Sequence, residues 1–320
     1  MDPSVKSSQA EIDPSRPAAL REAEVRALPP EQILVESGPY LILRLRGAEA
    51  PNLLHEVGRM RELTFRAAGE GTGRSVDLDE FDGWYDHLVA WHPETASVLG
   101  AYRVGRSDEL LATMGRGALY TSTLFDYSDT ILARMNPFLE LGRSFVCRDQ
   151  QRVGYVLMLL WKGIAQYVQR EPRYRRLVGP VSIDRTYKPA SLQLMVGFLS
   201  SRYQRAEAAE HVTARVPYQP SEADAMARLA EGAGLQDTDA LARVVADIEE
   251  GRGIPVLVRQ YLKLGSEVLG FNVDPDFSDV VDALMLLDLD RVDDLRLAFF
   301  MGRDAAQDFR ALAARPDDVG

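Results

Sequence analysis

The fold is decided by the segment Pro137-Phe-Leu-Glu140-Leu-Gly142-Arg143-Ser-Phe-Val146 and by the two stretches that follow it, Cys147-Arg-Asp-Gln-Gln151-Arg152-Val-Gly154 and Tyr155-Val-Leu-Met-Leu-Leu-Trp161-Lys-Gly-Ile-Ala-Gln-Tyr167. The first stretch predicts a strand, the second a polar turn, and the third a buried helix, because it is apolar for too long to be one strand. A turn of this kind can hold a phosphate, since its amides and the positive end of the helix converge there. Arg148 and Arg152 add full charges to the turn. An ordinary strand-to-helix connection has the same pattern, so that alternative stays open.

The composition predicts a globular protein without a nucleic-acid backbone as its main partner. The chain has 320 residues, of which 46% are hydrophobic and 27% charged, and its formal charge is -11. Such an acidic chain is repelled by phosphate backbones. A single cysteine, Cys147, excludes an internal disulfide framework and fits a reducing, cytoplasmic location. The four histidines show no metal-ligand spacing, so no metal site is expected.

The N-terminal region carries no targeting signal that we can identify. Residues 1–31 are polar, with prolines at 3, 14 and 17, and we expect them to be a disordered leader. No uncharged apolar run approaches the roughly 20 residues that span a bilayer. Any membrane contact is therefore expected to be peripheral, on the inner face of the membrane.

The order of the expected elements predicts an α/β (α+β) domain with a mixed sheet flanked by helices. Residues 32–215 are expected to form the core, and residues 216–320 a mostly helical C-terminal extension packed on it. In chain order the pattern predicts a strand pair over 32–45, a helix from Glu49, strands over 86–91 and 97–104, a short helix over 127–135, the decisive segment, a strand over 174–183, a helix over 189–203, two amphipathic helices over 221–250, a helix over 254–264, a loop over 270–277, a strand over 282–288 and a helix over 291–303.

This element order resembles that of the GNAT acyltransferases, which imply a GNAT-like mixed sheet. Those enzymes hold the pantetheine pyrophosphate of CoA with a Q/R-x-x-G-x-G/A turn. The matching segment here is Gln151-Arg-Val-Gly154-Tyr-Val156, in which the last small residue is missing. The Val156 side chain thus lies where the GNAT turn needs its backbone to come close to the pyrophosphate. This departure argues against ordinary acetyl-CoA binding.

A narrower resemblance links the chain to acyl-homoserine-lactone synthases, which take acyl groups from acyl carrier protein. It is carried by Phe65, the Asp79-x-x-Asp82 pair, Arg103, and Glu140-Leu-Gly-Arg143. A carrier protein delivers one phosphopantetheine phosphate and no adenosine, so a weaker pyrophosphate turn is tolerable.

A third resemblance, to the ornithine-lipid synthase and hemolysin-like N-acyltransferases, covers about residues 40–303. The motifs that carry it are Phe81-Asp-Gly-Trp-Tyr-Asp86-His87-Leu, Glu140-Leu-Gly-Arg143-Ser, Leu160-Trp-Lys-Gly-Ile-Ala165, Gly179-Pro-Val-Ser182-Ile, Ile254-Pro-Val-Leu-Val-Arg-Gln-Tyr261-Leu-Lys-Leu-Gly and Asn272-Val-Asp-Pro-Asp-Phe277. It implies an enzyme without a permanently bound cofactor, which uses an acyl-phosphopantetheine donor and a small amine or amino-acid acceptor. Phe65 is expected among the substrate-binding residues on the resemblance to acyl-homoserine-lactone synthases, and Ser182 on this one.

Acyl transfer from a thioester to an amine needs a proton acceptor and a donor to the thioester oxygen. Glu140 is the best candidate to receive the amine proton, directly or through a water. Residues three apart on a regular strand face opposite sides, so Glu140 and Arg143 share a site only if the strand is bulged. Gly142 would permit a bulge that turns a main-chain N–H toward the thioester oxygen. A structural Glu140–Arg143 ion pair is the alternative.

Several polar residues are candidates for acceptor binding. Asp79 and Asp82 are spaced for one face of a helical turn and can bind an ammonium group, although an N-cap in a solvated loop explains them equally well. Arg103 can pair with an acidic partner or with the acceptor carboxylate, or be a surface arginine of a strand. His87 can act as a second base, or be a half-buried strand histidine.

The donor side is expected around the turn before the predicted helix. Arg148 and Arg152 can hold the pantetheine phosphate, and the neighbouring basic residues 170, 173, 175 and 176 can steer an acidic carrier protein, unless they form an ordinary solvated charge run. Cys147 is expected to be a small buried residue and not a nucleophile. The residues expected to bind the donor are Val146, Arg148, Gln151, Arg152, Gly154 and Tyr155.

The sequence therefore predicts an N-acyltransferase that moves a long-chain acyl group from acyl carrier protein to the amino group of an amino acid or aminolipid precursor. An acyl-CoA-dependent GNAT acyltransferase acting on another amine or hydroxyl is one alternative. A non-catalytic GNAT-like binding protein is the other.

Overall fold

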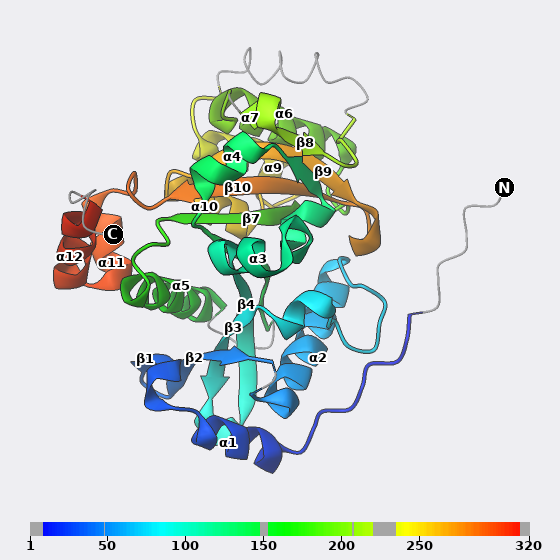
Figure 1. The fold of residues 1–320 in the computed structure, drawn as a ribbon. Coiled ribbons are helices and arrows are strands. Elements are labelled where there is room, and N and C mark those ends of the chain that lie inside the picture. Colours follow the sequence, from blue (N-terminus) through cyan, green and yellow to red (C-terminus); the bar gives the residue numbers. More distant parts are fainter. Residues whose placement is uncertain (1–8, 48, 148–152, 207, 220–234, 314–320) are drawn as a thin grey trace. The chain divides into compact units, whose positions relative to one another are not determined.

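The computed structural model describes residues 9–47, 49–147, 153–206, 208–219 and 235–313. It has a large mixed β-sheet flanked by helices, which confirms the predicted α/β class (Figure 1). Two compact units make up the chain: the first contains Met1–Gly105 and Leu141–Arg170, and the second Arg106–Glu140 and Glu171–Gly320. Within the described ranges, no helix is long and apolar enough to cross a membrane.

The first unit is built on an antiparallel ladder of strands with helix α5 packed against it. Its strand order is β1-β2-β3-β4, followed by β6. The helix α5 packs against β1, β2 and β3. It can approach β2 closely because residue 163 is glycine, where a Cβ atom would lie 2.6 Å from Ile42 Cγ2. The elements are α1 (Ala18–Ala27), η1 (Pro30–Gln32), β1 (Ile33–Ser37), β2 (Tyr40–Arg46), α2 (Pro51–Ala68), η2 (Glu80–Gly83), β3 (Asp86–His92), η3 (Pro93–Thr95), β4 (Ser97–Arg106), β6 (Leu139–Val146) and α5 (Val153–Arg170).

The second unit is built on β7, β10 and β9, which pair antiparallel in that order. Leu139 and Glu140, at the start of β6, pair parallel with β7. The short strands β5 and β8 form a separate antiparallel pair. The elements are α3 (Ser107–Met114), η4 (Arg116–Ala118), η5 (Tyr120–Thr123), β5 (Phe125–Tyr127), α4 (Asp129–Met135), β7 (Arg176–Ile183), α6 (Pro189–Tyr203), α7 (Ala208–His211), β8 (Val212–Ala214), α9 (Thr238–Ile248), α10 (Val256–Lys263), β9 (Glu267–Asp274), η6 (Pro275–Phe277), β10 (Val280–Asp288), α11 (Asp294–Met301) and α12 (Arg303–Ala313).

The prediction that residues 1–31 form a disordered leader is wrong over its described part. Helix α1 packs against α2, and the Glu24 carboxylate accepts hydrogen bonds from the main-chain N–H groups of Asn52 (3.0 Å) and Leu53 (2.8 Å) at the start of α2. Arg21 is buried and donates to the Ala96 carbonyl at 3.0 Å. These long-range contacts order a segment whose own composition is polar.

The C-terminal third, residues 216–320, was expected to be a mostly helical extension packed on the core. It contains helices α9, α10, α11 and α12, in agreement with that expectation, and it also contributes β9 and β10, which pair in the sheet with β7. Residues 270–277 were expected to be a loop, yet β9 runs through Asp274 with buried Asn272 and Asp274 side chains. The first of the two helices expected over 221–250 falls largely on residues outside the described ranges, and α9 corresponds to the second.

Candidate functional site

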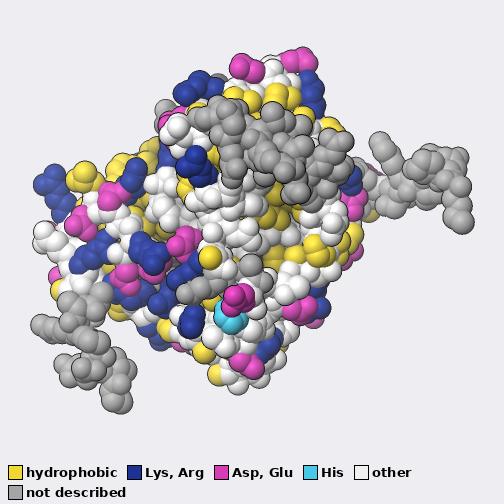
Figure 2. All heavy atoms as spheres, turned by 90° about the horizontal axis from the view of Figure 1, so that it is seen from above, with side chains coloured by type: hydrophobic (Ala, Val, Ile, Leu, Met, Phe, Trp, Pro, Cys, Tyr) yellow, Lys and Arg dark blue, Asp and Glu magenta, His cyan; other side chains and the backbone are white. Residues whose placement is uncertain are grey.

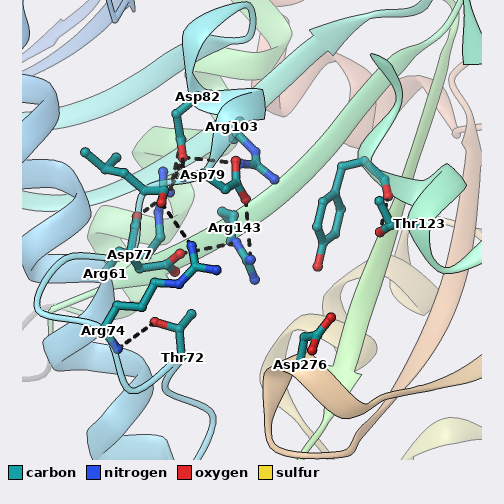
Figure 3. Close-up of polar contacts among 12 residues, drawn as sticks. Arg61, Thr72, Arg74, Asp77, Asp79, Asp82, Arg103, Thr123, Arg143 and Asp276 are labelled. Carbon is teal, nitrogen blue, oxygen red and sulfur yellow. Dashed lines mark hydrogen bonds and ion pairs between the residues drawn. The ribbon is translucent and has the colours of Figure 1, made fainter. Parts of the chain in front are cut away.

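A cluster of charged side chains occupies the first unit, between α2, the loop that follows it, η2, β4 and β6. Figure 3 shows the side chains of this charged cluster turned toward one another. Its carboxylates have arginine partners within ion-pairing distance, and most of its members are buried. The members are Arg61, Asp77, Asp79, Asp82, Arg103 and Arg143.

Asp79 and Asp82 lie on one turn, as their spacing predicts. Asp79 is the N-cap of η2, and the two carboxylates form a capping box: the Asp79 main-chain N–H donates to Asp82 Oδ2 at 2.8 Å. Asp82 is only 2% exposed, so the alternative of a solvated loop is wrong for this residue. Burial alone would raise the pKa of Asp82, but the charges of Arg61 and Arg103 outweigh it and hold that pKa well below its usual value.

Arg103 is not a surface arginine of a strand, because its side chain is fully buried. It pairs with Asp79, and its Nη1 lies 3.4 Å from Asp82 Oδ2. Its guanidinium also lies over the Phe81 and Tyr85 rings, 5.5 and 5.3 Å from the ring centroids. Burial lowers the pKa of Arg103, but the two carboxylates more than compensate, so Arg103 stays charged.

His87 is completely buried on β3, and not half-buried as predicted. Its Nε2 lies 3.2 Å from the main-chain oxygen of Asp82, to which it can donate. Burial lowers the pKa of His87 to about 4, and the Asp82 charge opposes this only in part. The imidazole is therefore neutral at pH 7, and a neutral ring enclosed in this way fits a structural role better than that of a second base.

The backbone of β6 is irregular at Arg143, whose φ is +47°. Left-handed backbone is uncommon for a residue other than glycine, and it interrupts the alternation of side chains along the strand. The sequence predicted an irregular strand here, but with Gly142 as the special residue; Gly142 is not among the residues of positive φ. Arg143 is 12% exposed, with Nε 3.6 Å from Asp77 Oδ1 and Nη2 3.5 Å from Asp79 Oδ2.

Glu140 belongs to the second unit and is 1% exposed. Its Oε2 accepts from the Tyr120 main-chain N–H at 3.0 Å, and its Oε1 from the Thr121 N–H at 2.7 Å. The carboxylate therefore holds the start of η5. An ionised carboxylate can in general take up a proton.

The remaining predicted substrate residues lie in different surroundings. Phe65 is nearly buried on α2, with its ring 6.4 Å from that of Phe145. Ser182 is on β7, where its hydroxyl donates to buried Asp282 at 2.7 Å. The structure therefore brings Asp79, Asp82 and Arg103 together in the charged cluster, and places His87 against Asp82. Ser182 belongs to the second unit.

Half of the predicted donor site lies within the described residues. Val146 ends β6, and Gly154 and Tyr155 are in the first turn of α5. Tyr155 packs on the β1–β2 hairpin, with its hydroxyl 2.8 Å from the Ser37 hydroxyl. Val156, which replaces the small residue of the GNAT turn, is buried in the core at 1% exposure. Arg148, Gln151 and Arg152 lie outside the described residues.

Two of the basic residues that were expected to steer a carrier protein have acidic partners. Arg173 pairs with Asp108 (3.0 Å) and Glu109 (3.1 Å), and Arg175 pairs with Asp290 (2.6 Å). On the face drawn in Figure 2, arginines and lysines likewise lie beside acidic side chains. The expected steering surface is therefore largely neutralised at these two positions.

Sequence reasoning missed Arg61 and Asp77 as members of the cluster. The signal for Arg61 was available, because it continues the buried stripe of α2 at the spacing of Leu53, Val57 and Phe65. An arginine on such a stripe needs a buried acidic partner, and Arg61 finds it in Asp82. Asp77 carries no comparable signal, since its neighbours in sequence are typical of a loop.

Comparisons with known proteins agree with this architecture. A model of the acetyltransferase (GNAT) domain matches residues 60–162, which include the charged cluster and β6. A glycine N(alpha)-acyltransferase of Bacteroides thetaiotaomicron is 31% identical over 258 residues, covering 76% of this chain and 75% of that protein. A protein of the same name from Phocaeicola vulgatus is 29% identical over 260 residues, covering 76% and 78%. An L-ornithine N(alpha)-acyltransferase of Brucella abortus is 25% identical over 288 residues, covering 84% and 95%.

Proposed function

The chain belongs to the GNAT-domain N-acyltransferases that include these glycine and ornithine enzymes, and on that premise we propose that it moves a long-chain acyl group from acyl carrier protein to the α-amino group of an amino acid. Acyl transfer to an amino group follows from the family itself. The alternative of a non-catalytic binding protein is thereby set aside. The acceptor class, the acyl length and the donor are our proposals.

The acceptor proposal is supported by the two amino acids that appear in the names of the relatives, glycine and ornithine. Glycine and ornithine share an α-amino group next to a carboxylate and differ in the side chain. An enzyme descended from the same ancestor is expected to bind the shared part. Simple amines without a carboxylate should therefore be poor acceptors.

The donor proposal is supported by the first turn of α5. A buried valine at position 156 replaces the glycine or alanine that lets a backbone approach the CoA pyrophosphate. Acyl carrier protein presents a single phosphate on its pantetheine arm, so it needs less of this approach. Val146, Gly154 and Tyr155, together with Arg148, Gln151 and Arg152, remain the residues that we assign to the arm.

The chemistry that we propose centres on Glu140. The amine nitrogen attacks the thioester carbon, the carbon–sulfur bond breaks, and the thiolate leaves. An acceptor bound as an ammonium loses two protons in forming the amide, of which the thiolate takes one, so one proton is released per turnover. Glu140 is assigned to take up the amine proton, and a main-chain N–H near the irregular Gly142–Arg143 segment to donate to the thioester oxygen.

In and around the charged cluster, we assign partly exposed Asp79 to the substrate and three buried residues to support. Asp79 is 16% exposed by side chain and can contact an acceptor. Asp82, His87 and Arg103 are enclosed, so we assign them to holding the loop that carries Asp79. Phe65 and Ser182 stay assigned to the substrate.

The test is a matrix of donors and acceptors with the purified full chain. Palmitoyl-acyl carrier protein, palmitoyl-CoA and acetyl-CoA are each offered with glycine, L-ornithine and ethanolamine, and the amide products are measured by mass spectrometry. We expect transfer from palmitoyl-acyl carrier protein to the two amino acids, at least about 10-fold more efficient than from palmitoyl-CoA, equivalent to about 1.4 kcal/mol.

Each arm of this experiment overturns a different part of the proposal. Equal or better use of palmitoyl-CoA contradicts the carrier-protein donor. Acylation of ethanolamine at the rate of glycine contradicts recognition of an amino acid. A preference for acetyl-CoA contradicts the long acyl chain.

A further inference from the structure

Two buried hydroxyl groups of the second unit stand beside Glu140. Thr121 on η5 is 0% exposed, and Tyr127 at the end of β5 is 6% exposed. The two hydroxyls lie close to each other, but neither makes a hydrogen bond of normal geometry to a described group. A buried hydroxyl without a well-formed hydrogen bond lowers the stability of the folded state, so two such groups side by side require an explanation.

Both residues are tied to the Glu140 carboxylate. The Thr121 main-chain N–H donates to Glu140 Oε1 at 2.7 Å, so the Thr121 residue is next to the carboxylate. Burial raises the pKa of Tyr127, and the nearby negative charge of Glu140 raises it further. Glu140 is itself the last residue of β6 that pairs with β7, so the sheet ladder ends at this point.

These three side chains offer what a primary ammonium group requires. An ammonium has three N–H donors and no acceptor, and it is best held by a carboxylate together with neutral oxygens. We infer that Glu140, Thr121 and Tyr127 form the binding site for the acceptor's ammonium group, an inference that rests on the proposed function and adds Thr121 and Tyr127 to its site.

The chemistry of the three groups divides their roles. The raised pKa of Tyr127 keeps its phenol protonated at neutral pH, so Tyr127 accepts a hydrogen bond from the ammonium through its oxygen and does not take its proton. The Thr121 hydroxyl acts in the same way. Glu140 is then the one member of the trio that can accept the proton.

Two nearly isosteric variants, Tyr127→Phe and Thr121→Val, remove one hydroxyl each. For either variant we expect KM for glycine to rise at least about 10-fold, since a hydrogen bond to a charged group is lost. KM for palmitoyl-acyl carrier protein should stay within about twofold, since the site does not touch the donor. The melting temperature should not fall, because no hydrogen bond of normal geometry to a described group is broken. Thr121→Ser keeps the hydroxyl and should restore most of the glycine affinity.

The matched control is Tyr187→Phe, in the same unit. The Tyr187 hydroxyl donates to the Gly253 carbonyl at 2.7 Å, so its loss should lower the melting temperature and leave KM for glycine unchanged. If Tyr127→Phe behaves like this control, the Tyr127 hydroxyl is structural and the inference is overturned.

The inference and the proposed function fail separately. A wild-type chain that acylates glycine, with Tyr127→Phe and Thr121→Val of unchanged glycine KM, contradicts the ammonium site alone. Calorimetric titration of glycine without a donor supplies a readout that does not depend on turnover. If the wild type acylates no amine but binds glycine, and both variants lose this binding, then the site stands and the proposed reaction fails. Absence of both binding and transfer contradicts both.

Discussion

Arg61 Nη1 lies 3.1 Å from Asp82 Oδ1, and the two side chains are 0% and 3% exposed. The same nitrogen also donates to the Asp77 carbonyl at 3.0 Å, so Arg61 ties α2 to both ends of the segment that leads into η2. Ion pairs in such surroundings contribute little when both partners are exchanged for apolar groups. Removing one partner, however, leaves an uncompensated buried charge.

Arg61→Met should therefore destabilise the first unit strongly. We expect a loss of about 3–5 kcal/mol, because Asp82 stays buried with fewer compensating charges. Urea unfolding followed by circular dichroism measures this loss. Arg26→Ala, which removes the exposed Arg26–Glu22 pair, is the control and should change stability by less than about 0.5 kcal/mol. A loss below about 1 kcal/mol for Arg61→Met would show that the charged cluster is not buried as described.

His87 should make the protein less stable as the pH falls from 6.5 to 4. Its pKa is about 4 in the folded state against about 6.5 in an unfolded chain, so the unfolded state binds more protons within this window. Stability is then full above pH 6.5 and about 3 kcal/mol lower near pH 4 from this group alone. The pKa of Asp82 is also lowered, but its contribution is lost only below about pH 3.9, so it does not confuse the reading.

The measurement is the urea midpoint between pH 7 and pH 4.5. His87→Gln keeps an N–H donor for the Asp82 carbonyl and removes the titrating group, so it should flatten the profile. An unchanged slope in His87→Gln would assign the pH dependence to another group.

Gly142 should tolerate a methyl group, contrary to the role that the sequence suggested for it. No atom lies within 4 Å of a Cβ built there, and its φ is not positive. Gly142→Ala should thus change stability by less than about 1 kcal/mol. Gly100→Ala is the contrast: its Cβ would lie 2.5 Å from the Phe145 main-chain oxygen, and we expect a loss of about 1–3 kcal/mol or more. Thermal melting of the two variants distinguishes them. An unstable Gly142→Ala variant would show that the irregular backbone of β6 requires a glycine at position 142.

The sequence pattern predicted correctly those helices and strands whose apolar spacing and end residues match their positions in the fold. Helix α6 begins and ends where its proline and its apolar spacing place it, and the β3–β4 hairpin has the predicted bounds within two residues. Helix α1 and strand β9 were missed because distant contacts stabilise them. Arg21 is buried against Ala96, and Asn272 on β9 accepts from the Val216 N–H. The polar sequences of these two segments therefore do not predict that they are ordered and buried.

The site shows the same division. The spacing of Asp79 and Asp82 predicted one turn, but not that Arg61, 21 residues before Asp82, would neutralise it. Glu140 was identified as the candidate proton acceptor, while its two amide partners come from a turn whose position no pattern in the sequence predicts.

Glu24 should stabilise the protein through its position at the start of α2. Its two carboxylate oxygens accept from the main-chain N–H groups of Asn52 and Leu53, which have no partners inside the helix. Glu24→Gln keeps one acceptor but turns an N–H₂ group toward one of these donors, so we expect a loss of about 1–2 kcal/mol. Glu22→Gln, which affects only the exposed pair with Arg26, should be nearly neutral. Equal melting temperatures for the two variants would show that Glu24 on α1 does not stabilise the start of α2.

Glu140→Gln should lose much more activity than its loss of stability can explain. Glu140 resembles Glu24 in accepting from two successive main-chain N–H groups, so both glutamine variants should destabilise the fold by similar amounts. Only Glu140 is assigned to the amine proton, and removing a general base typically costs about 100-fold to 10,000-fold in rate. Glu24→Gln is therefore the matched control: at a temperature where both variants are folded, it should keep the wild-type kcat while Glu140→Gln falls by at least about 100-fold. If the two variants lose activity equally, Glu140 serves to hold η5, and the proton must go to another group.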